Sequence, residues 1–147
     1  MPKEVVQEKV LIVDDEHDFV TVLAKRLRNN GWDAETAESG QEALDKVAKS
    51  DFAAVILDLK MPGLDGLQTL KELKKANPNL QIIFLTGHGS IREGVDAMKH
   101  GALDFLEKPA DFDELLEKIK EARAQRMLLV DKNVEDRITD ILKSKSW

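Results

Sequence analysis

The chain has 147 residues, of which 42% are hydrophobic and 34% charged, which suits the core and surface of one globular domain. Its formal net charge is -6 and its longest basic run is Lys74-Lys75, so we expect no direct binding to nucleic acid. The absence of cysteine excludes disulfides, thiolate metal sites and a cysteine nucleophile. The lack of a long apolar segment predicts a soluble, cytoplasmic protein without membrane contact.

Short apolar runs alternate along the chain with longer amphipathic stretches. We predict that the runs are strands and that the stretches are helices, because the stretches carry apolar residues at helical spacing. The third run, 52–57, is apolar on both alternating faces, which is typical of a strand buried on both sides in a parallel sheet. In chain order the predicted strands are 10–13, 32–36, 52–57, 81–85 and 103–106, each followed by a helix.

Five strand–helix repeats predict an α/β fold with a five-stranded parallel sheet, right-handed crossovers and helices on both faces. The helix boundaries carry local signals. Asn29-Asn30-Gly31 ends the first helix, Ser90 and Glu93 form a capping box that opens the fourth, and Asp111 caps the fifth. Ligands of such sheets bind at the carboxyl ends of the strands, so polar residues at those positions are the candidate site.

The tail differs from the repeats. We expect a domain of residues 1–126 and a C-terminal helical extension of residues 127–147. Apolar residues recur at helical spacing in this extension, and Asp131 is a candidate cap for a separate sixth helix. The extension is predicted to pack on the domain, to form a dimer or to act as a linker, since an apolar stripe does not name its partner.

The strand ends bring three carboxylates, a hydroxyl and an ammonium to one edge of the predicted sheet. Close carboxylates repel each other unless a cation lies among them, and oxygen ligands without His or Cys favour Mg²⁺, or Mn²⁺, over zinc. An acidic pocket with a divalent cation and nearby donors suits phosphoryl transfer to a carboxylate. The residues concerned are Asp14, Asp15, Asp58, Thr86 and Lys108.

The sequence resembles the receiver domain of two-component response regulators over about residues 8 to 124. No single motif decides this resemblance, but their order and spacing are specific. The matching segments are 10–16 with Asp14-Asp15-Glu16, 57–66 with Asp58 and Met61-Pro62-Gly63, 85–89 with Thr86-Gly87, and 105–109 with Lys108-Pro109. The resemblance implies the doubly wound, flavodoxin-like (βα)5 version of the predicted fold.

The resemblance also implies a metal site and a phosphoacceptor. Asp58 would accept the phosphoryl group. Asp15 would bind Mg²⁺ directly, Asp14 directly or through water, and the backbone carbonyl of Lys60 would be a further ligand. Each carboxylate also has a purely structural explanation, because Asp58 could cap a turn and Asp14-Asp15 could begin a helix.

Further roles are implied around the phosphoryl group. Lys108 would pair with its oxygens, and Thr86 would donate its hydroxyl and move toward it. Phe105 would be the switch aromatic that turns inward as Thr86 moves, although an aromatic in an apolar strand can also be plain core. Gly87 would leave room for the group. Lys60 and His88 would flank it and tune water access, and the alternative for His88 is an exposed loop residue.

The expected function is a phosphorylation-dependent signalling switch, not an enzyme in the usual sense. A sensor histidine kinase or a phosphotransfer protein would supply the phosphoryl group, and the receiver would catalyse only its own phosphorylation and dephosphorylation. The output would be a downstream protein target or a fused output domain, so a fragment of a longer transcription regulator is one alternative. A phosphatase of the haloacid dehalogenase type is another, but it needs a second Asp where this chain has Lys60.

Overall fold

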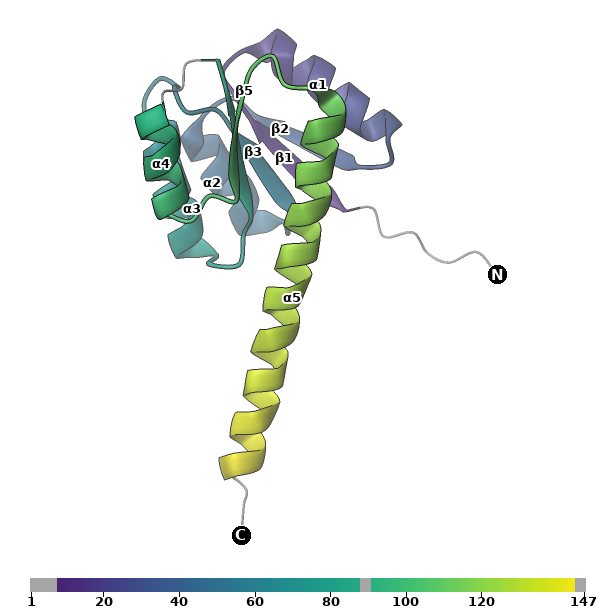
Figure 1. Cartoon of the computed structure of the whole chain (residues 1–147), viewed down its shortest axis with the longest axis vertical. Coiled ribbons are helices and arrows are strands. Elements are labelled where there is room, and N and C mark those ends of the chain that lie inside the picture. The colour runs from purple at the N-terminus through teal and green to yellow at the C-terminus, as the bar shows by residue number, and fades with distance from the viewer. Residues whose placement is uncertain (1–7, 88–90, 145–147) are drawn as a thin grey trace, which may run out of the picture.

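A computed structural model describes residues 8–87 and 91–144 of the chain. Five parallel strands form one sheet, as predicted, and their order in it is β2-β1-β3-β4-β5 (Figure 1). The strands are β1 (Lys9–Val13), β2 (Asp33–Ala37), β3 (Ala54–Leu57), β4 (Ile82–Thr86) and β5 (Asp104–Glu107), and the helices are α1 (His17–Asn29), α2 (Gly40–Lys49), α3 (Gly66–Ala76), α4 (Ile91–Lys99) and α5 (Phe112–Ser144).

Helices cover both faces of the sheet, because alternate residues of the central strands point to opposite sides. On one side Ile12 and Ile56 pack with apolar residues of α1 and α5, such as Leu27 and Ile119. On the other side Leu57 packs with α2, α3 and α4. All four residues of β3 are buried, which explains why the run showed no polar alternation. The doubly wound α/β class predicted from the sequence is therefore confirmed.

The fifth helix departs from the prediction. The tail is helical, as expected, but it is not a separate sixth helix capped at Asp131: α5 is one continuous helix of 33 residues. Asp111 does begin it, since its carboxylate accepts a hydrogen bond from the backbone N–H of Asp113 at 3.2 Å. The stretch from Arg126 onward contains no Gly or Pro, so nothing in the backbone interrupts the helix. Its second half projects away from the domain (Figure 1).

Two of the other predicted boundaries can be compared with the structure. Gly31 closes α1 in the left-handed conformation, with φ of 90°, which glycine adopts without steric cost. Glu93 lies in the first turn of α4, but Ser90, the other half of the expected capping box, lies outside the described residues.

The start of α3 lies against the loop that follows β3. The backbone N–H of Gly66 donates to the carbonyl of Leu59 at 2.8 Å, and the side chain of Asp65 caps the helix by accepting from Gln68. A Cβ atom at position 66 would lie 2.3 Å from the carbonyl oxygen of Asp58 and 2.6 Å from the Cα of Leu59. Any side chain at this position would therefore displace the backbone that carries Asp58.

We expect Gly66→Ala to destabilise the domain by ~3 kcal/mol, because its clash is with backbone rather than with a flexible side chain. The matched control is Gly94→Ala in α4, where the nearest atoms belong to the Phe105 ring at 3.4 Å and alanine favours the helix. That control should change stability by less than about 1 kcal/mol. Urea denaturation of both variants measures the difference, and equal losses would contradict the explanation.

Candidate functional site

The predicted site residues lie at the carboxyl edge of the sheet. Asp14 and Asp15 directly follow β1, Asp58 follows β3 and Lys108 follows β5, whereas Thr86 is the last residue of β4. Backbone hydrogen bonds fix their relative positions. Asp58 donates its N–H to the carbonyl of Val13 at 2.9 Å, and Lys108 donates to Thr86 at 2.9 Å. Parallel pairing therefore brings together residues that are up to 94 positions apart in sequence.

Three carboxylates form one cluster at this edge. One oxygen each of Asp14, Asp15 and Asp58 lies within 4.8 Å of the other two. Asp15 is exposed, but Asp14 and Asp58 retain only 1% and 3% of their accessible surface. Within the described part of the chain, the buried Oδ1 of Asp58 has no hydrogen-bond partner. A buried carboxylate oxygen without a partner is costly, so this arrangement favours a cation at the cluster.

Burial raises the pKa of Asp58 above its usual value of 3.8. A hydrogen bond with Thr86 opposes this rise, the negative charges of Asp14 and Asp15 add to it, and the positive charge of Lys108 opposes it. The net direction is upward because desolvation of the carboxylate is the largest effect. A cation at the cluster would oppose this rise and favour the ionised carboxylate, which is the form that can act as a nucleophile.

Lys108 is the positively charged side chain at the cluster. Its Nζ lies 2.6 Å from Oδ2 of Asp14 and 3.4 Å from Oε1 of Glu16. It also lies 3.9 Å from the centre of the Phe19 ring, which suits a cation. Burial alone would lower the pKa of Lys108, but the hydrogen bond with Asp14 and the charges of Asp58 and Glu16 raise it overall. The amine is therefore held as an ammonium.

Glu16 and Phe19 are the site residues that sequence reasoning missed. In the sequence, Phe19 has the spacing of an ordinary apolar helix residue, and Glu16 is simply the residue after Asp14-Asp15. Both lie where α1 begins, since Glu16 is the N-cap residue of this helix and Phe19 lies in its first turn. The sequence does not show that the side chain of Lys108 reaches Glu16 and Phe19.

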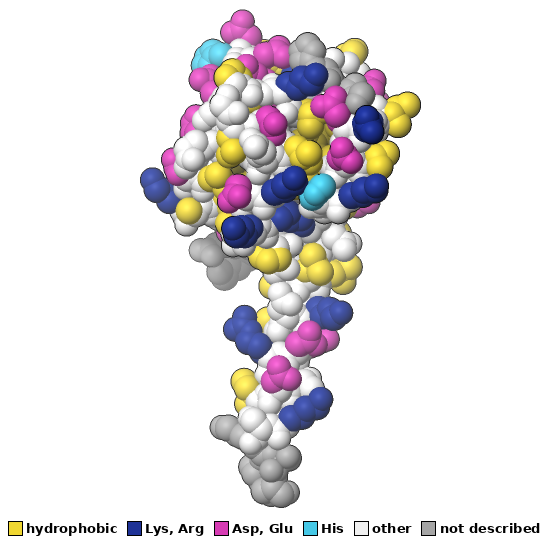
Figure 2. Space-filling view, turned by 90° about the vertical axis from the view of Figure 1, so that its left-hand side faces the viewer, with side chains coloured by type: hydrophobic (Ala, Val, Ile, Leu, Met, Phe, Trp, Pro, Cys, Tyr) yellow, Lys and Arg dark blue, Asp and Glu magenta, His cyan; other side chains and the backbone are white. Residues whose placement is uncertain are grey.

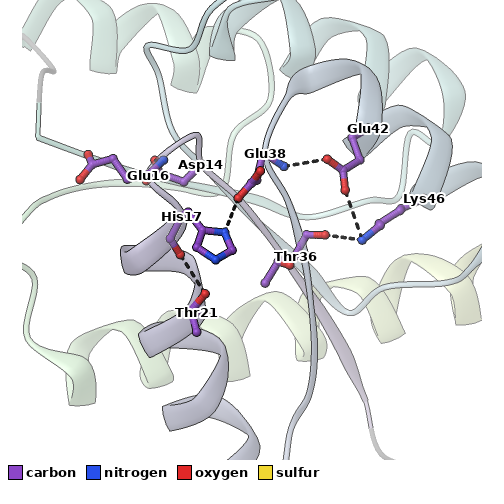
Figure 3. Close-up of polar contacts among 8 residues, drawn as sticks. All are labelled: Asp14, Glu16, His17, Thr21, Thr36, Glu38, Glu42 and Lys46. Carbon is purple, nitrogen blue, oxygen red and sulfur yellow. Dashed lines mark hydrogen bonds and ion pairs between the residues drawn. The ribbon is translucent and has the colours of Figure 1, made fainter.

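A second polar network ties the first residue of α1 to the loop after β2 (Figure 3). Nδ1 of His17 lies 2.6 Å from Oε1 of Glu38, and this contact raises the pKa of the imidazole. The backbone N–H of Glu38 donates to Glu42 at 3.0 Å, and Glu42 in turn pairs with Lys46 at 3.6 Å. The side chain of His17 is largely exposed, and this network lies outside the carboxylate cluster.

Phe105 and Thr86 occupy neighbouring strands behind the cluster. Thr86 is fully buried. Phe105 is half-buried, with its ring centre 6.0 Å from that of Phe84 and its edge against Gly94 of α4. A groove between α4 and β5 runs over this ring and is lined by the exposed side chains of Ile91, Val95 and Met98, among others. The ring of Phe105 is thus one of the side chains that line this groove.

The remaining predicted site residues lie around the cluster or outside the described residues. Lys60 is exposed in the loop between β3 and α3, two residues after Asp58. A Cβ atom at Gly87 would lie 3.9 Å from Cβ and Cδ of Lys108, so this glycine lies beside the aliphatic part of that side chain. His88 lies outside the described residues.

Comparison with known proteins agrees with this geometry. The model of the response regulator receiver domain family matches residues 10–120. The transcriptional regulatory protein ZraR of Klebsiella oxytoca is 40% identical over 122 residues, which are 83% of this chain and 28% of that protein. Among solved structures, a receiver domain from Clostridium thermocellum is 35% identical with a TM-score of 0.79, and the match covers 83% of this chain and 98% of that one. The NtrX receiver domain of Brucella abortus is 37% identical with a TM-score of 0.74, and the match covers 78% of this chain and 98% of that one.

The chain therefore belongs to the response regulator receiver domain family. Receiver domains of response regulators are signalling switches, and this one has the fold and the carboxylate cluster of the family. The chain spans about a quarter of the length of ZraR and similar regulators that it matches. No helix among the described residues is long and apolar enough to cross a membrane.

We expect Asp58→Asn to stabilise the protein at pH 7. Because the pKa of Asp58 is higher in the folded than in the unfolded state, the native state binds more protons, and stability falls as the pH rises from 3.8 through the folded pKa. Asparagine removes this loss, so the melting temperature at pH 7 should rise by about 3 °C, or ~1 kcal/mol. The gain should vanish below pH 3.8, where the wild-type carboxyl is protonated in both states.

The exposed Asp45 provides the control, since Asp45→Asn removes a carboxylate outside the cluster. Thermal melts of both variants at several pH values make the comparison. A stabilisation by Asp58→Asn that does not depend on pH, or that Asp45→Asn reproduces, would show that ionisation of Asp58 is not its cause.

Proposed function

We propose that this receiver accepts a phosphoryl group on Asp58 and thereby switches its interaction surface. One observation carries the proposal: a nearly buried Asp58 whose Oδ1 has no hydrogen-bond partner among the described residues lies beside two more carboxylates. Thr86 and Lys108 lie at the same edge as hydrogen-bond donors. A purely structural cap would not require a second buried carboxylate so close to the first.

A divalent metal ion fits the residues present. Oxygen atoms of Asp14, Asp15 and Asp58 are close enough to share one ion, and no His or Cys belongs to this group of described residues. We propose that these three carboxylates and the backbone carbonyl of Lys60 hold Mg²⁺, or Mn²⁺ in its place. The bound ion would supply positive charge that neutralises the carboxylates and the phosphoryl oxygens.

The transfer itself uses the protein's own groups for positioning. The donor is a phosphohistidine of a sensor kinase or a phosphotransfer protein. One oxygen of Asp58 forms a bond to phosphorus while the phosphorus–nitrogen bond breaks, and the electron pair of that bond stays on the imidazole, which takes up a proton. Lys108 offers its ammonium to the phosphoryl oxygens, and Thr86 offers its hydroxyl. The receiver in this way catalyses its own modification and, with water as the acceptor, its reversal.

The modification would be read at the face formed by α4 and β5. Movement of Thr86 toward the phosphoryl group would leave space behind it, and the ring of Phe105 would turn into that space. This changes the groove between α4 and β5, whose exposed apolar residues suit a protein partner. The partner is a downstream protein or an output domain of the same polypeptide, as the relatives described as transcriptional regulators suggest.

Treatment with acetyl phosphate and Mg²⁺ should add one phosphoryl group to the whole chain, and chelation of the metal should abolish the addition. Asp58→Asn should gain none, whereas the control Asp45→Asn should gain one as the wild type does. Intact-mass spectrometry before and after alkaline hydrolysis measures the group and its acyl-phosphate character. A hydrolysable phosphoryl group that persists in Asp58→Asn would overturn the assignment of the acceptor.

Residues beside the acceptor should set the lifetime of the phosphate. We propose that the side chains of Lys60 and His88 limit the approach of water to the phosphoryl group, so Lys60→Ala and His88→Ala should each hydrolyse several-fold faster. The control is Lys75→Ala, which removes an exposed lysine at the far end of α3. Decay of the phosphorylated form is followed by mass spectrometry, and wild-type rates in both variants would remove the proposal.

A further inference from the structure

The ammonium of Lys108 meets three partners at the edge of the carboxylate cluster. Its Nζ lies 2.6 Å from Oδ2 of Asp14, 3.4 Å from Oε1 of Glu16 and 3.9 Å from the centre of the Phe19 ring. An ammonium has three N–H bonds, so two carboxylates and one ring face are enough to receive all of them. Because the side chain of Lys108 is only 15% exposed, these partners replace most of its water.

The two carboxylates are less suited than the ring to hold this ammonium during phosphoryl transfer. Asp14 also belongs to the cluster, and its other oxygen accepts the backbone N–H of Glu16 at 2.9 Å. The side chain of Glu16 is 59% exposed, and an ion pair with an exposed partner contributes little. Both carboxylates are anions, so they compete with phosphoryl oxygens for the N–H groups of Lys108.

The ring of Phe19 stabilises the ammonium without this competition. The face of an aromatic ring attracts a cation but has no net charge, so the full charge of Lys108 stays available to an anion. The ring is also held from behind, because Phe19 packs against the apolar core on the side of α1 and α5. An aliphatic side chain at this position would fill the same space, but it would not attract the ammonium.

We propose that Phe19 is a positioning residue for phosphoryl transfer and that its ring is the fixed partner of the Lys108 ammonium. The ammonium keeps its contact with the ring while it exchanges the carboxylate of Asp14 for phosphoryl oxygens. Without the ring, fewer molecules hold the ammonium at the cluster, and transfer slows in proportion. The inference rests on the proposed acceptor role of Asp58, but the contact itself can be measured in the unphosphorylated protein.

The chain contains a matched control for this contact. Phe112, the first residue of α5, is also half-buried and packs against the same apolar core. Its ring centre lies 4.0 Å from the guanidinium carbon of Arg26, so it too faces a cation. Phe19 and Phe112 even line the same pocket, between α1 and the start of α5. A change of ring character at Phe112 therefore tests packing and a cation contact without altering the partner of Lys108.

Fluorinated phenylalanines incorporated at position 19 of the whole chain weaken the negative ring face and keep the apolar bulk of the side chain. With acetyl phosphate and Mg²⁺, the rate constant for phosphorylation of Asp58 should fall with each added fluorine, by about three-fold or more over the series. Phe19→Leu should also slow the reaction, whereas Phe19→Tyr, which keeps a ring face, should stay near the wild type. The same fluorinated series at Phe112 should leave the rate unchanged. Equal effects of the two series, or no effect at position 19, would overturn the proposal.

Nuclear magnetic resonance tests the contact separately from the transfer. The methylene protons next to an ammonium that lies over a ring are shifted upfield by the ring current. This shift of the Lys108 signal should be present in the unphosphorylated wild type, disappear in Phe19→Leu and remain in Phe112→Leu. It should also persist after phosphorylation, since the ring is the partner that the ammonium keeps.

Two outcomes of this measurement would overturn the proposal: a Lys108 signal without the shift in the wild type, and a shift that is lost on phosphorylation. A shifted signal in a chain that gains no phosphoryl group would instead confirm the contact and contradict the acceptor role of Asp58. The two experiments therefore distinguish a failure of the positioning role from a failure of the proposed function.

Discussion

Concentration of negative charge at one edge of the sheet is the constraint on which the rest of the site depends. Parallel pairing aligns the ends of β1 and β3, and the chain has an aspartate at both ends. The cluster is tolerated because Lys108, anchored to Thr86 through its backbone, reaches back to Asp14. The protein thereby compensates one carboxylate and leaves the pKa of Asp58 raised. A site that is short of positive charge is suited to bind a cation and to respond to it.

The apolar framework makes this arrangement rigid. The central strands are buried on both faces, so the loops that follow them begin from fixed points. Close approach at Gly66 fixes the loop after β3, and the pair of His17 with Glu38 joins the start of α1 to the loop after β2. The cluster is in this way held by three kinds of contact: strand pairing, backbone packing and surface ion pairs. The exposed ion pair contributes little on its own.

Two surfaces remain available for partners, and they differ in origin. The groove between α4 and β5 is continuous with Phe105, which lies next in the sheet to the strand that carries Thr86. Exposed apolar side chains on the projecting part of α5, away from the carboxylate cluster, form the second surface (Figure 2).

The sequence alone determined the fold class and the composition of the cluster. Hydrophobic periodicity and the order of elements depend on local residues, so the five strands, their helices and the aspartates at strand ends could be predicted. The partners of Lys108 could not be, because Glu16 and Phe19 meet its ammonium only after β5 lies beside β4 and α1 covers the same face. The buried state of Asp58, and hence its raised pKa, is likewise a property of packing. Only the tertiary structure showed that the tail continues α5 and projects from the domain. A helical pattern in the sequence fixes which residues share an apolar face, but it does not fix whether another part of the protein covers that face.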